Sequence, residues 1–326
     1  MKNTINLIVA IKKQGQRVDQ YISNNEKDLS RTRIKNLILK KKLKVNELIV
    51  QDPSKKIKDG DIINLEIPKP NIVSLKPYDF VLDIIYEDKD LMVINKPTGI
   101  SMHPGAGNYD KTLVNALMNY DCKNLSNIGD ELRPGIVHRI DKDTSGVIVV
   151  AKNDFAHTDL SEQFKNHTIV RVYEALVWGS LKPQNGKIIE KISRSIKNRQ
   201  LMAVRKEKGK VSITNYKTLK VYRNENLPKI SLIECKLETG RTHQIRVHMN
   251  FKGNSILGDK SYGKSKKKFK KIDPIIEKKI NSFNRQALHA KSLGFIHPAT
   301  KKEIFFEAKR PKDFDALIKI LNKASF

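Results

Sequence analysis

The chain has 326 residues, 39% hydrophobic and 30% charged, and its 63 Lys and Arg against 35 Asp and Glu give a net charge of +28. The length fits about two domains, and the charge favours a polyanionic partner. No run of about 18 apolar residues is present to span a membrane, so nucleic acid, not a membrane, is the expected partner.

The N-terminal segment and the cysteines bear on where the protein works. The apolar stretch before Lys12 is short and has no small-residue cleavage site, so we do not expect a signal peptide. Cys122 and Cys235 are far apart and neither belongs to a CxxC pair, which argues against a disulfide framework or a zinc ribbon. We therefore expect a cytoplasmic protein without a bound metal.

Residues 15–68 are expected to form a small α/β module. Residues 16–22 favour a short helix, and Ser30 is placed to cap a second one whose apolar residues recur at helical spacing. Short strands are expected at 44–46, 47–50 and 61–67. We predict that basic residues on the helices and just after them contact an RNA backbone, although a solvated helix face is the simpler alternative: Arg17, Arg31, Arg33, Lys35 and Lys41.

A proline-rich segment follows this module. Pro68, Pro70 and Pro77 remove backbone donors and favour an extended chain, which is typical of a linker. We therefore expect an RNA-binding domain at 1–68, a linker at 69–79 and a second domain at 80–326. A lysine-rich run at 264–271 is expected to be a mobile loop, either with some RNA affinity or simply solvated.

The second domain contains many candidate strands and few candidate helices. The expected strands are 81–86, 91–95, 147–151, 171–177, 212–216, 229–237, 243–249, 293–296 and 303–307, and the expected helices are 113–119, 154–165 and 313–323. Because strands and helices do not alternate strictly, the pattern predicts an α+β fold with a mainly antiparallel, mixed sheet.

Asp141 is the first candidate for chemistry. It precedes Thr144-Ser145-Gly146 and a buried-looking strand, so a tight turn is expected to hold its carboxylate at a sheet edge. His138, Arg139 and Lys142 are expected to surround it with donors and positive charge. Taken alone, an aspartate beside a turn is more often structural than catalytic.

Two further segments supply candidate partners. Arg246 lies in the predicted strand 243–249, where a buried charge is costly unless it is paired, and Asp141 is a suitable partner. Tyr173 lies in the strand 171–177, where it either packs or stacks on a base. Asp141 and Asp143 also form a D-x-D spacing that can hold Mg²⁺ with a nucleotide sugar, but Lys142 lies between them and no phosphate-binding glycine loop accompanies them.

Four segments carry a resemblance to a known family. The segments His138–Gly146, Arg171–Gly179 and Gly240–His248 resemble those of the RluA-type RNA pseudouridine synthases, Arg285–Ala290 matches the family's C-terminal part, and the resemblance extends over roughly 80–320. The segments 95–99 and 103–107 look most like the RluD-like branch, which acts on large-subunit ribosomal RNA. Residues 15–68 resemble a small RNA-binding module first seen in a ribosomal protein, except that Lys41 or Lys42 stands where that module usually has glycine.

The resemblance implies a function and a set of roles. The protein would isomerise specific uridines in ribosomal RNA, either free or in a pre-ribosomal particle, as a monomer and without a cofactor. Asp141 would be the catalytic carboxylate, Arg246 would hold it ionised, and Tyr173 would stack beneath the uracil. Asp141 would attack the sugar, attack the ring or remove a sugar proton. Arg139 would fill the space left by the flipped base or contact a phosphate.

A second hypothesis belongs to a different class of protein. The charge of +28 and the N-terminal module also suit a non-catalytic RNA-binding factor for ribosome assembly. Such a factor has no need of Asp141, Tyr173 and Arg246 together. A pseudouridine map of ribosomal RNA with and without the protein discriminates between the two hypotheses.

Overall fold

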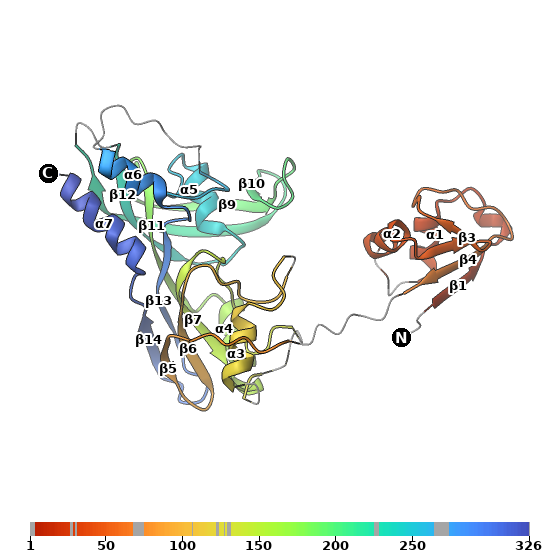
Figure 1. The fold of residues 1–326 in the computed structure, drawn as a ribbon, viewed down its shortest axis with the longest axis horizontal. Coiled ribbons are helices and arrows are strands. Elements are labelled where there is room, and N and C mark those ends of the chain that lie inside the picture. Colours follow the sequence, from red (N-terminus) through yellow and green to blue (C-terminus); the bar gives the residue numbers. More distant parts are fainter. Residues whose placement is uncertain are drawn as a thin grey trace. The chain divides into compact units, whose positions relative to one another are not determined.

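The chain folds into two compact units, Met1–Ser74 and Leu75–Phe326 (Figure 1). The computed structural model describes residues 4–26, 29, 31–67, 75–105, 107–121, 124–126, 128, 132–224, 228–263 and 274–325, without the side chains of residues 32 and 33. The expected cap Ser30, part of the expected linker and all of the lysine-rich run lie outside these residues.

The N-terminal unit is a four-stranded antiparallel sheet with two α-helices. The strand order is β1-β4-β2-β3, and β1 was not expected from the sequence. The elements are β1 (Thr4–Ile8), η1 (Ile11–Lys13), α1 (Val18–Asn25), α2 (Arg31–Leu39), β2 (Leu43–Val45), β3 (Leu48–Val50) and β4 (Ile62–Glu66). Ile22, Ile34 and Ile38 are fully buried between the helices and the sheet, so this unit has a core of its own.

Helix α2 ends in a motif that usually contains glycine. Lys41 has a φ of 63°, in the left-handed region. Its N–H donates to the carbonyl of Ile38, and the N–H of Lys42 donates to the carbonyl of Leu37, both at 3.0 Å. These two bonds form a Schellman C-cap. The lysine therefore adopts the backbone conformation that glycine adopts more easily at this position.

The second unit is built on one large mixed sheet. Among the described residues, ten strands pair in the order β10-β9-β11-β12-β8-β13-β7-β6-β5, with β14 beside β13. All of these pairs are antiparallel except β13 with β7, which confirms the expected fold class. The strands are β5 (Ile84–Glu87), β6 (Leu91–Lys96), β7 (Ser145–Ala151), β8 (Val170–Trp178), β9 (Asn185–Arg194), β10 (Met202–Val204), β11 (Lys210–Tyr222), β12 (Ile230–Leu237), β13 (Leu288–Ile296) and β14 (Glu303–Glu307).

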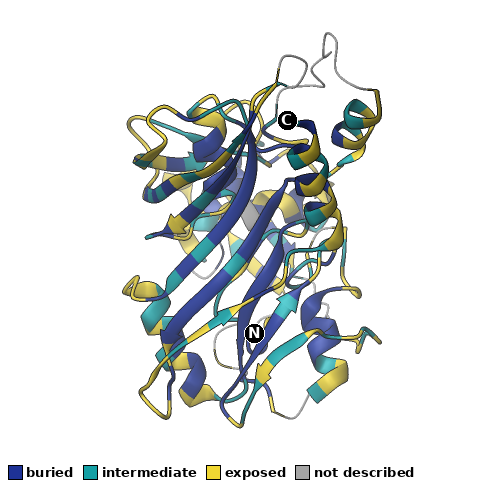
Figure 2. Cartoon of the chain, turned by 90° about the vertical axis from the view of Figure 1, so that its left-hand side faces the viewer, coloured by how far each residue is buried: buried dark blue, intermediate teal, exposed yellow. Residues whose placement is uncertain are grey.

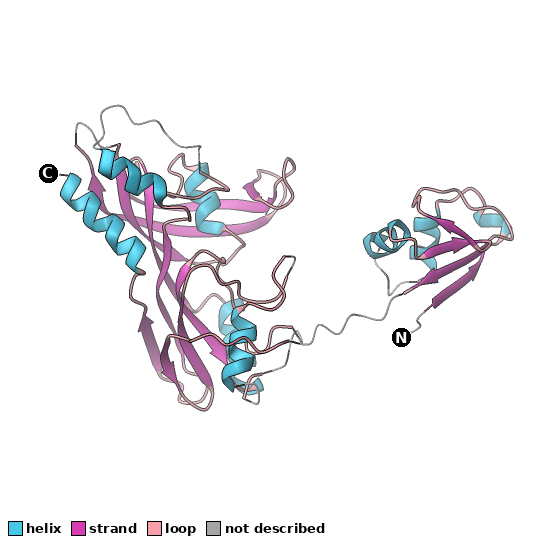
Figure 3. Ribbon diagram, in the orientation of Figure 1, coloured by secondary structure: helices cyan, strands magenta, loops and turns pink. Residues whose placement is uncertain are grey.

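Helices cover both faces of this sheet (Figures 2 and 3). They are α3 (Leu113–Asp121), α4 (Asp154–Lys165), α5 (Gln244–Phe251), α6 (Pro274–Ser282) and α7 (Lys312–Ala324). All seven residues of β7 are buried. Ile148 and Val150 contribute to one core with α3 and α7, while Val147 and Val149 contribute to another with α4. Burial on both faces explains the continuous apolar run of β7.

The predicted strand 243–249 is wrong, because these residues form helix α5. Alternating apolar residues suggested a strand, but every residue from Gln244 to Met249 is buried. The polar members of the alternation do not face water. Gln244 bonds to Thr214 and the backbone of Ile213, and His248 also bonds to Thr214. A period of two loses its diagnostic value when both sides of a segment are buried.

Candidate active site

Asp141 lies in a tight turn directly before β7. The N–H of Thr144 donates to the carbonyl of Asp141 at 3.1 Å, which closes the turn. Gly146, the second residue of the strand, has a φ of 119°, and a Cβ there would collide with the backbone of Ala290. The glycine therefore allows β13 to approach β7 closely. The expected turn is therefore present, at the start of a strand that lies inside the sheet between β13 and β6.

A buried lysine connects the turn of Asp141 to the loop after β6. Lys96, at the end of β6, is fully buried, and its Nζ donates to the carbonyls of Pro97, Ile100 and Lys142 at 2.7, 3.0 and 3.0 Å. Burial lowers the pKa of Lys96 to about 7, although the nearby carboxylates of Asp143 and Asp141 oppose that shift. Three bonds to backbone carbonyls tie the loop after β6 to the turn that carries Asp141.

Arg246 lies between two carboxylates. Its Nη1 donates to Asp141 Oδ2 at 2.9 Å, while its Nε and Nη2 donate to Asp259 Oδ2 and Oδ1 at 2.7 and 2.9 Å. The Asp259 side chain is fully buried and the Asp141 side chain is 19% exposed. The two-pronged pair with Asp259 fixes the guanidinium plane, and the remaining Nη1 holds the accessible carboxylate.

His243 approaches the other oxygen of Asp141. Its Nε2 lies 3.8 Å from Asp141 Oδ1, and its Nδ1 lies 2.8 Å from the hydroxyl of Tyr262. That hydroxyl accepts the N–H of Met202, so its own proton is available for Nδ1. The neutral ring then carries its proton on Nε2, toward Asp141. Burial lowers the pKa of His243, which favours the neutral ring.

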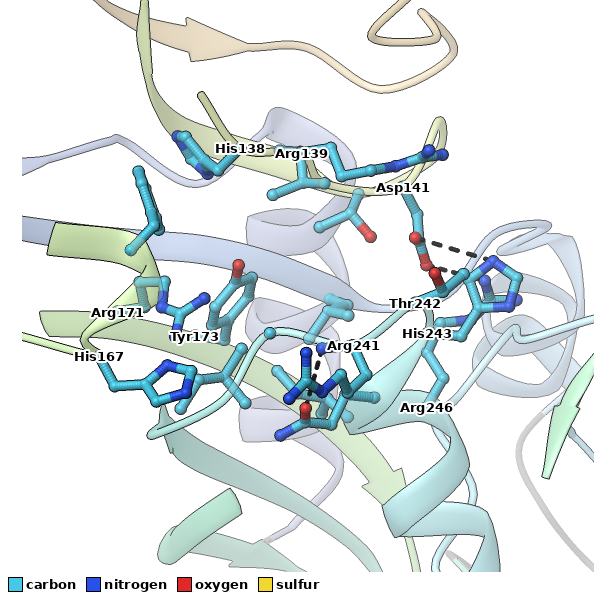
Figure 4. A pocket seen from close by; sticks show the side chains of 18 of the residues that line it. His138, Arg139, Asp141, His167, Arg171, Tyr173, Arg241, Thr242, His243 and Arg246 are labelled. Atoms are coloured by element: carbon cyan, nitrogen blue, oxygen red, sulfur yellow. Dashed lines mark hydrogen bonds and ion pairs between the residues drawn. The ribbon is translucent and has the colours of Figure 1, made fainter. Parts of the chain in front are cut away.

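Tyr173 lines the same cleft from the sheet. The cleft has a volume of about 470 Å³, and Tyr173, on β8, is 8% exposed. Burial raises the pKa of its phenol. Figure 4 shows Tyr173 and Asp141 on opposite sides of the cleft, with Arg246 and His243 beside Asp141. The three residues Asp141, Tyr173 and Arg246, predicted from separate motifs, therefore line a single cavity.

His138 does not supply positive charge to this site, contrary to expectation. Burial lowers its pKa to about 3, so the ring is neutral. Its Nε2 accepts the N–H of Val149 at 3.0 Å, and the ring stacks on Phe164 with centroids 4.5 Å apart. Arg139, by contrast, is exposed at the rim, with its Nη1 3.2 Å from His103 Nε2.

The basic residues of the N-terminal unit differ in how far they are exposed and paired. Arg17 and Arg31 both bind the buried carboxylate of Asp19, at 3.0 Å each, yet keep 37% and 48% of their side chains exposed. Lys35 and Lys41 are exposed. The side chain of Arg33 lies outside the described part of the structure.

One side-chain group among the described residues has metal-ligand spacing, and it is remote from the cleft residues in sequence: Asp88, Asp90 and His297. His297 Nε2 lies 2.7 Å from Asp88 Oδ2, and its Nδ1 accepts the N–H groups of Ala299 and Thr300. These bonds engage the atoms that a metal would need, so the group fastens two turns. None of the described helices is long and apolar enough to cross a membrane.

Several site residues were not found from the sequence. Asp259 follows no recognisable strand or helix pattern, and no local signal connects it to Arg246. Lys96 lies in the segment 95–99 and received no predicted role, although a lysine that ends an apolar run is a signal for a buried charge. Arg171 lies in the predicted strand 171–177 and Arg241 lies in the segment Gly240–His248, but neither of them was given a role from the sequence alone.

Comparison with known proteins places these features in a family. A model of RNA pseudouridylate synthases matches residues 90–251, and a model of the S4 domain matches 16–63. The chain is 46% identical over 309 residues to the ribosomal large subunit pseudouridine synthase D of Zymomonas mobilis, covering 94% of each chain. It is 40% identical to the protein of that name from Vibrio parahaemolyticus, covering 95% of this chain and 92% of the other.

A solved structure agrees with the sequence comparisons. The human RNA pseudouridylate synthase domain containing 4 superposes with a TM-score of 0.55 at 26% identity, over 73% of this chain and 92% of that one. The resemblance inferred from the motifs is confirmed. The chain belongs to the RNA pseudouridylate synthase family and is an enzyme that isomerises uridine in RNA.

Proposed function

We propose that this enzyme forms pseudouridine at specific positions of large-subunit ribosomal RNA, with Asp141 as the catalytic carboxylate. The observation that carries the role of Asp141 is its position: it is the single carboxylate lining the cleft among the described residues, and Arg246 holds one of its oxygens at 2.9 Å. Two relatives named ribosomal large subunit pseudouridine synthase D align with this chain over 92% to 94% of their own length. These alignments support large-subunit ribosomal RNA as the substrate.

The reaction is an isomerisation, so atoms balance within the nucleotide. The bond between uracil N1 and ribose C1′ breaks, the uracil turns, and C5 is joined to C1′. C5 then loses its proton and N1 gains one. The target base must leave its stack to reach the cleft. Arg246 orients the Asp141 carboxylate toward the cleft through the hydrogen bond from its Nη1 to Asp141 Oδ2.

Tyr173 is proposed to stack beneath the uracil. Its ring lies on the sheet side of the cleft, is largely buried and is fixed within β8. A rigid aromatic surface is suited to any orientation of the base while the base turns, because stacking needs no particular hydrogen-bonding edge. Arg139, exposed at the rim, is proposed to contact RNA outside the cleft.

The N-terminal unit is proposed to be the RNA-binding module, joined through residues 69–79 to the catalytic domain at 80–326. The exposed cations Arg31, Lys35 and Lys41 and the half-buried Arg17 support this role, and Arg33 lies in helix α2 with Arg31 and Lys35. A tethered module raises the local concentration of RNA at the cleft. We also propose that the enzyme acts in the cytoplasm as a monomer, on free ribosomal RNA or an assembling particle.

The test is a pseudouridine map of ribosomal RNA from cells that carry wild-type protein, Asp141→Asn or Asp143→Asn. Asp143 belongs to the same turn, so it is a matched control for the carboxylate and for the D-x-D alternative. We expect Asp141→Asn to abolish the modification while RNA binding survives, and Asp143→Asn to retain it. Retained modification in Asp141→Asn contradicts the assigned role, and an unchanged map in cells lacking the protein contradicts the proposed substrate.

A further inference from the structure

Two arginines line the cleft away from Asp141, and neither has a carboxylate partner among the described residues (Figure 4). Arg171 is 8% exposed. Its Nη2 makes one long contact, 3.5 Å, with the carbonyl of Glu238, and its guanidinium lies 5.7 Å from the centre of the Phe164 ring. The Nε atoms of Arg171 and Arg241 are both buried and have no hydrogen-bond partner among the residues that the structure describes.

A buried cation without an anion is costly. Arg246 shows how this fold satisfies such a group, with two carboxylates at hydrogen-bond distance. Arg171 has no equivalent, and burial lowers its pKa, with the nearby charge of Arg241 acting in the same direction. An anion bound between the two guanidinium groups would relieve both the unsatisfied donors and their mutual repulsion.

The position of Arg171 is fixed by the loop above it. A Cβ at Gly240 would collide with Nη1 of Arg171, so the glycine leaves room for the guanidinium. The next residue, Arg241, is held through its backbone N–H, which donates to Gln244 Oε1 at 3.0 Å. Gln244 is itself fixed by Thr239 and Thr214. The two arginines therefore lie in a preorganised wall rather than on a free surface.

The charge of the cleft points to the same class of ligand. Its lining includes one carboxylate, Asp141, which Arg246 already binds. Four other cations line the cleft, namely Arg139, Lys165, Arg171 and Arg241. A guanidinium has several donors in one plane and suits the oxygens of a phosphate.

We propose that Arg171 and Arg241 bind a phosphodiester group of the substrate RNA next to the target uridine. This subsite rests on the proposed function for its substrate. Arg171 and Tyr173 lie on the same face of β8, and alternate residues of a strand are roughly 7 Å apart. A base above Tyr173 and its backbone phosphate at Arg171 fit this separation. The phosphate fixes the nucleotide while the free uracil turns.

The first test measures binding of the full chain to a heptaribonucleotide with a single central uridine. Arg171→Met and Arg241→Met keep the long apolar stem and remove the charge, and Arg223→Met is the control, since Arg223 is exposed after the end of β11. We expect about tenfold weaker binding for each cleft variant. The logarithm of the association constant decreases with the logarithm of the salt concentration, and we expect this negative slope to become less steep by about 1 for each lost phosphate contact. Arg171→Lys should restore the slope.

The second test places an uncharged methylphosphonate on either side of the uridine. At one of the two positions the methylphosphonate should weaken binding to the wild type. It should have little further effect on Arg171→Met, because the arginine charge that pairs with this phosphate is already gone. Equal loss in both proteins overturns the proposal, as does wild-type affinity and slope in Arg171→Met. Thermal unfolding of each variant checks its fold, and Arg171→Lys keeps the test valid if the methionine variant unfolds.

These outcomes are separable from the proposed function. An unchanged ribosomal pseudouridine map in cells lacking the protein, together with arginine-dependent binding of the methylphosphonate series, would reject the ribosomal substrate and keep the phosphate subsite. A changed map with no arginine dependence would keep the ribosomal substrate and reject the subsite.

Discussion

Replacing Asp259 by asparagine removes one of the two carboxylates that share Arg246. Asp259 Oδ1 accepts Arg246 Nη2 and the N–H groups of Ser261 and Tyr262, while Oδ2 accepts Arg246 Nε at 2.7 Å. An asparagine that keeps its oxygen toward the three donors directs its NH₂ group at the Nε–H of Arg246. Breaking a buried ion pair in this way costs about 3–5 kcal/mol.

Asp141→Asn is the matched control, because it removes the other partner of the same guanidinium. Its side chain is 19% exposed and makes one bond to Arg246, at 2.9 Å. We expect a loss of at most about 1.5 kcal/mol there. Each kcal/mol shifts the melting temperature of a domain of this size by about 2–4 °C, so Asp259→Asn should lower it by roughly 6–20 °C.

Calorimetry of the full chain measures both effects, since the two units have separate cores and their transitions can be followed in one scan. Pseudouridine formation is assayed below the first transition. We expect Asp141→Asn to be stable and inactive, and Asp259→Asn to be unstable and slowed. The reasoning is refuted if Asp259→Asn unfolds within about 1 kcal/mol of the wild type, or if Asp141→Asn is the less stable variant.

Three further predictions concern the turn, the pH dependence and the N-terminal unit. Gly146→Ala should yield little soluble protein, because φ is 119° and the new Cβ would collide with the backbone of Ala290; soluble, active protein would contradict the packing of β13 on β7. Burial lowers the pKa of His248 to about 4, so as the pH falls the unfolded chain takes up a proton before the folded protein does, and the free energy of unfolding decreases from about pH 6.5 to about pH 4. His248→Gln should reduce the slope of the free energy of unfolding against pH in this range by about 1.4 kcal/mol per pH unit. An unchanged slope would show that His248 does not titrate this way. Deleting residues 1–68 should weaken RNA binding more than it slows turnover at saturating RNA, and equal losses in both would argue against a tethered module.

Much of the second unit could be predicted from sequence because its strands are long and apolar. The predicted helix 154–165 coincides with α4, and the run 147–151 lies within β7. The prediction was weakest where polar residues are buried. Helix α5 was taken for a strand for this reason. Strand β9 was missed for another reason, because Ile188 and Ile192 are its only buried residues and the rest of the strand is exposed or half-buried.

The residues of the site likewise divide into those that the sequence could predict and those that it could not. Asp141 and Arg246 could be paired from sequence because a buried charge needs a partner and the motifs are specific. Asp259, Tyr262 and Arg171 could not be added, because their contacts depend on the path of the chain between β12 and β13 and not on local periodicity. Hydrogen bonds of this kind become visible only when separate elements are brought together.

The strand order has a consequence for the synthesis of the enzyme. β13 lies between β8 and β7, although it is among the last strands in the chain. A nascent chain that has not yet reached residue 288 holds two separate sets of strands, and the turn of Asp141 lacks the backbone of Ala290 against which it packs. Such long-range closure is slow to form. The enzyme therefore gains its active site only after the ribosome has made most of the catalytic domain. A chain shortened before β13 contains the motif of Asp141 but lacks the strand on which its turn packs.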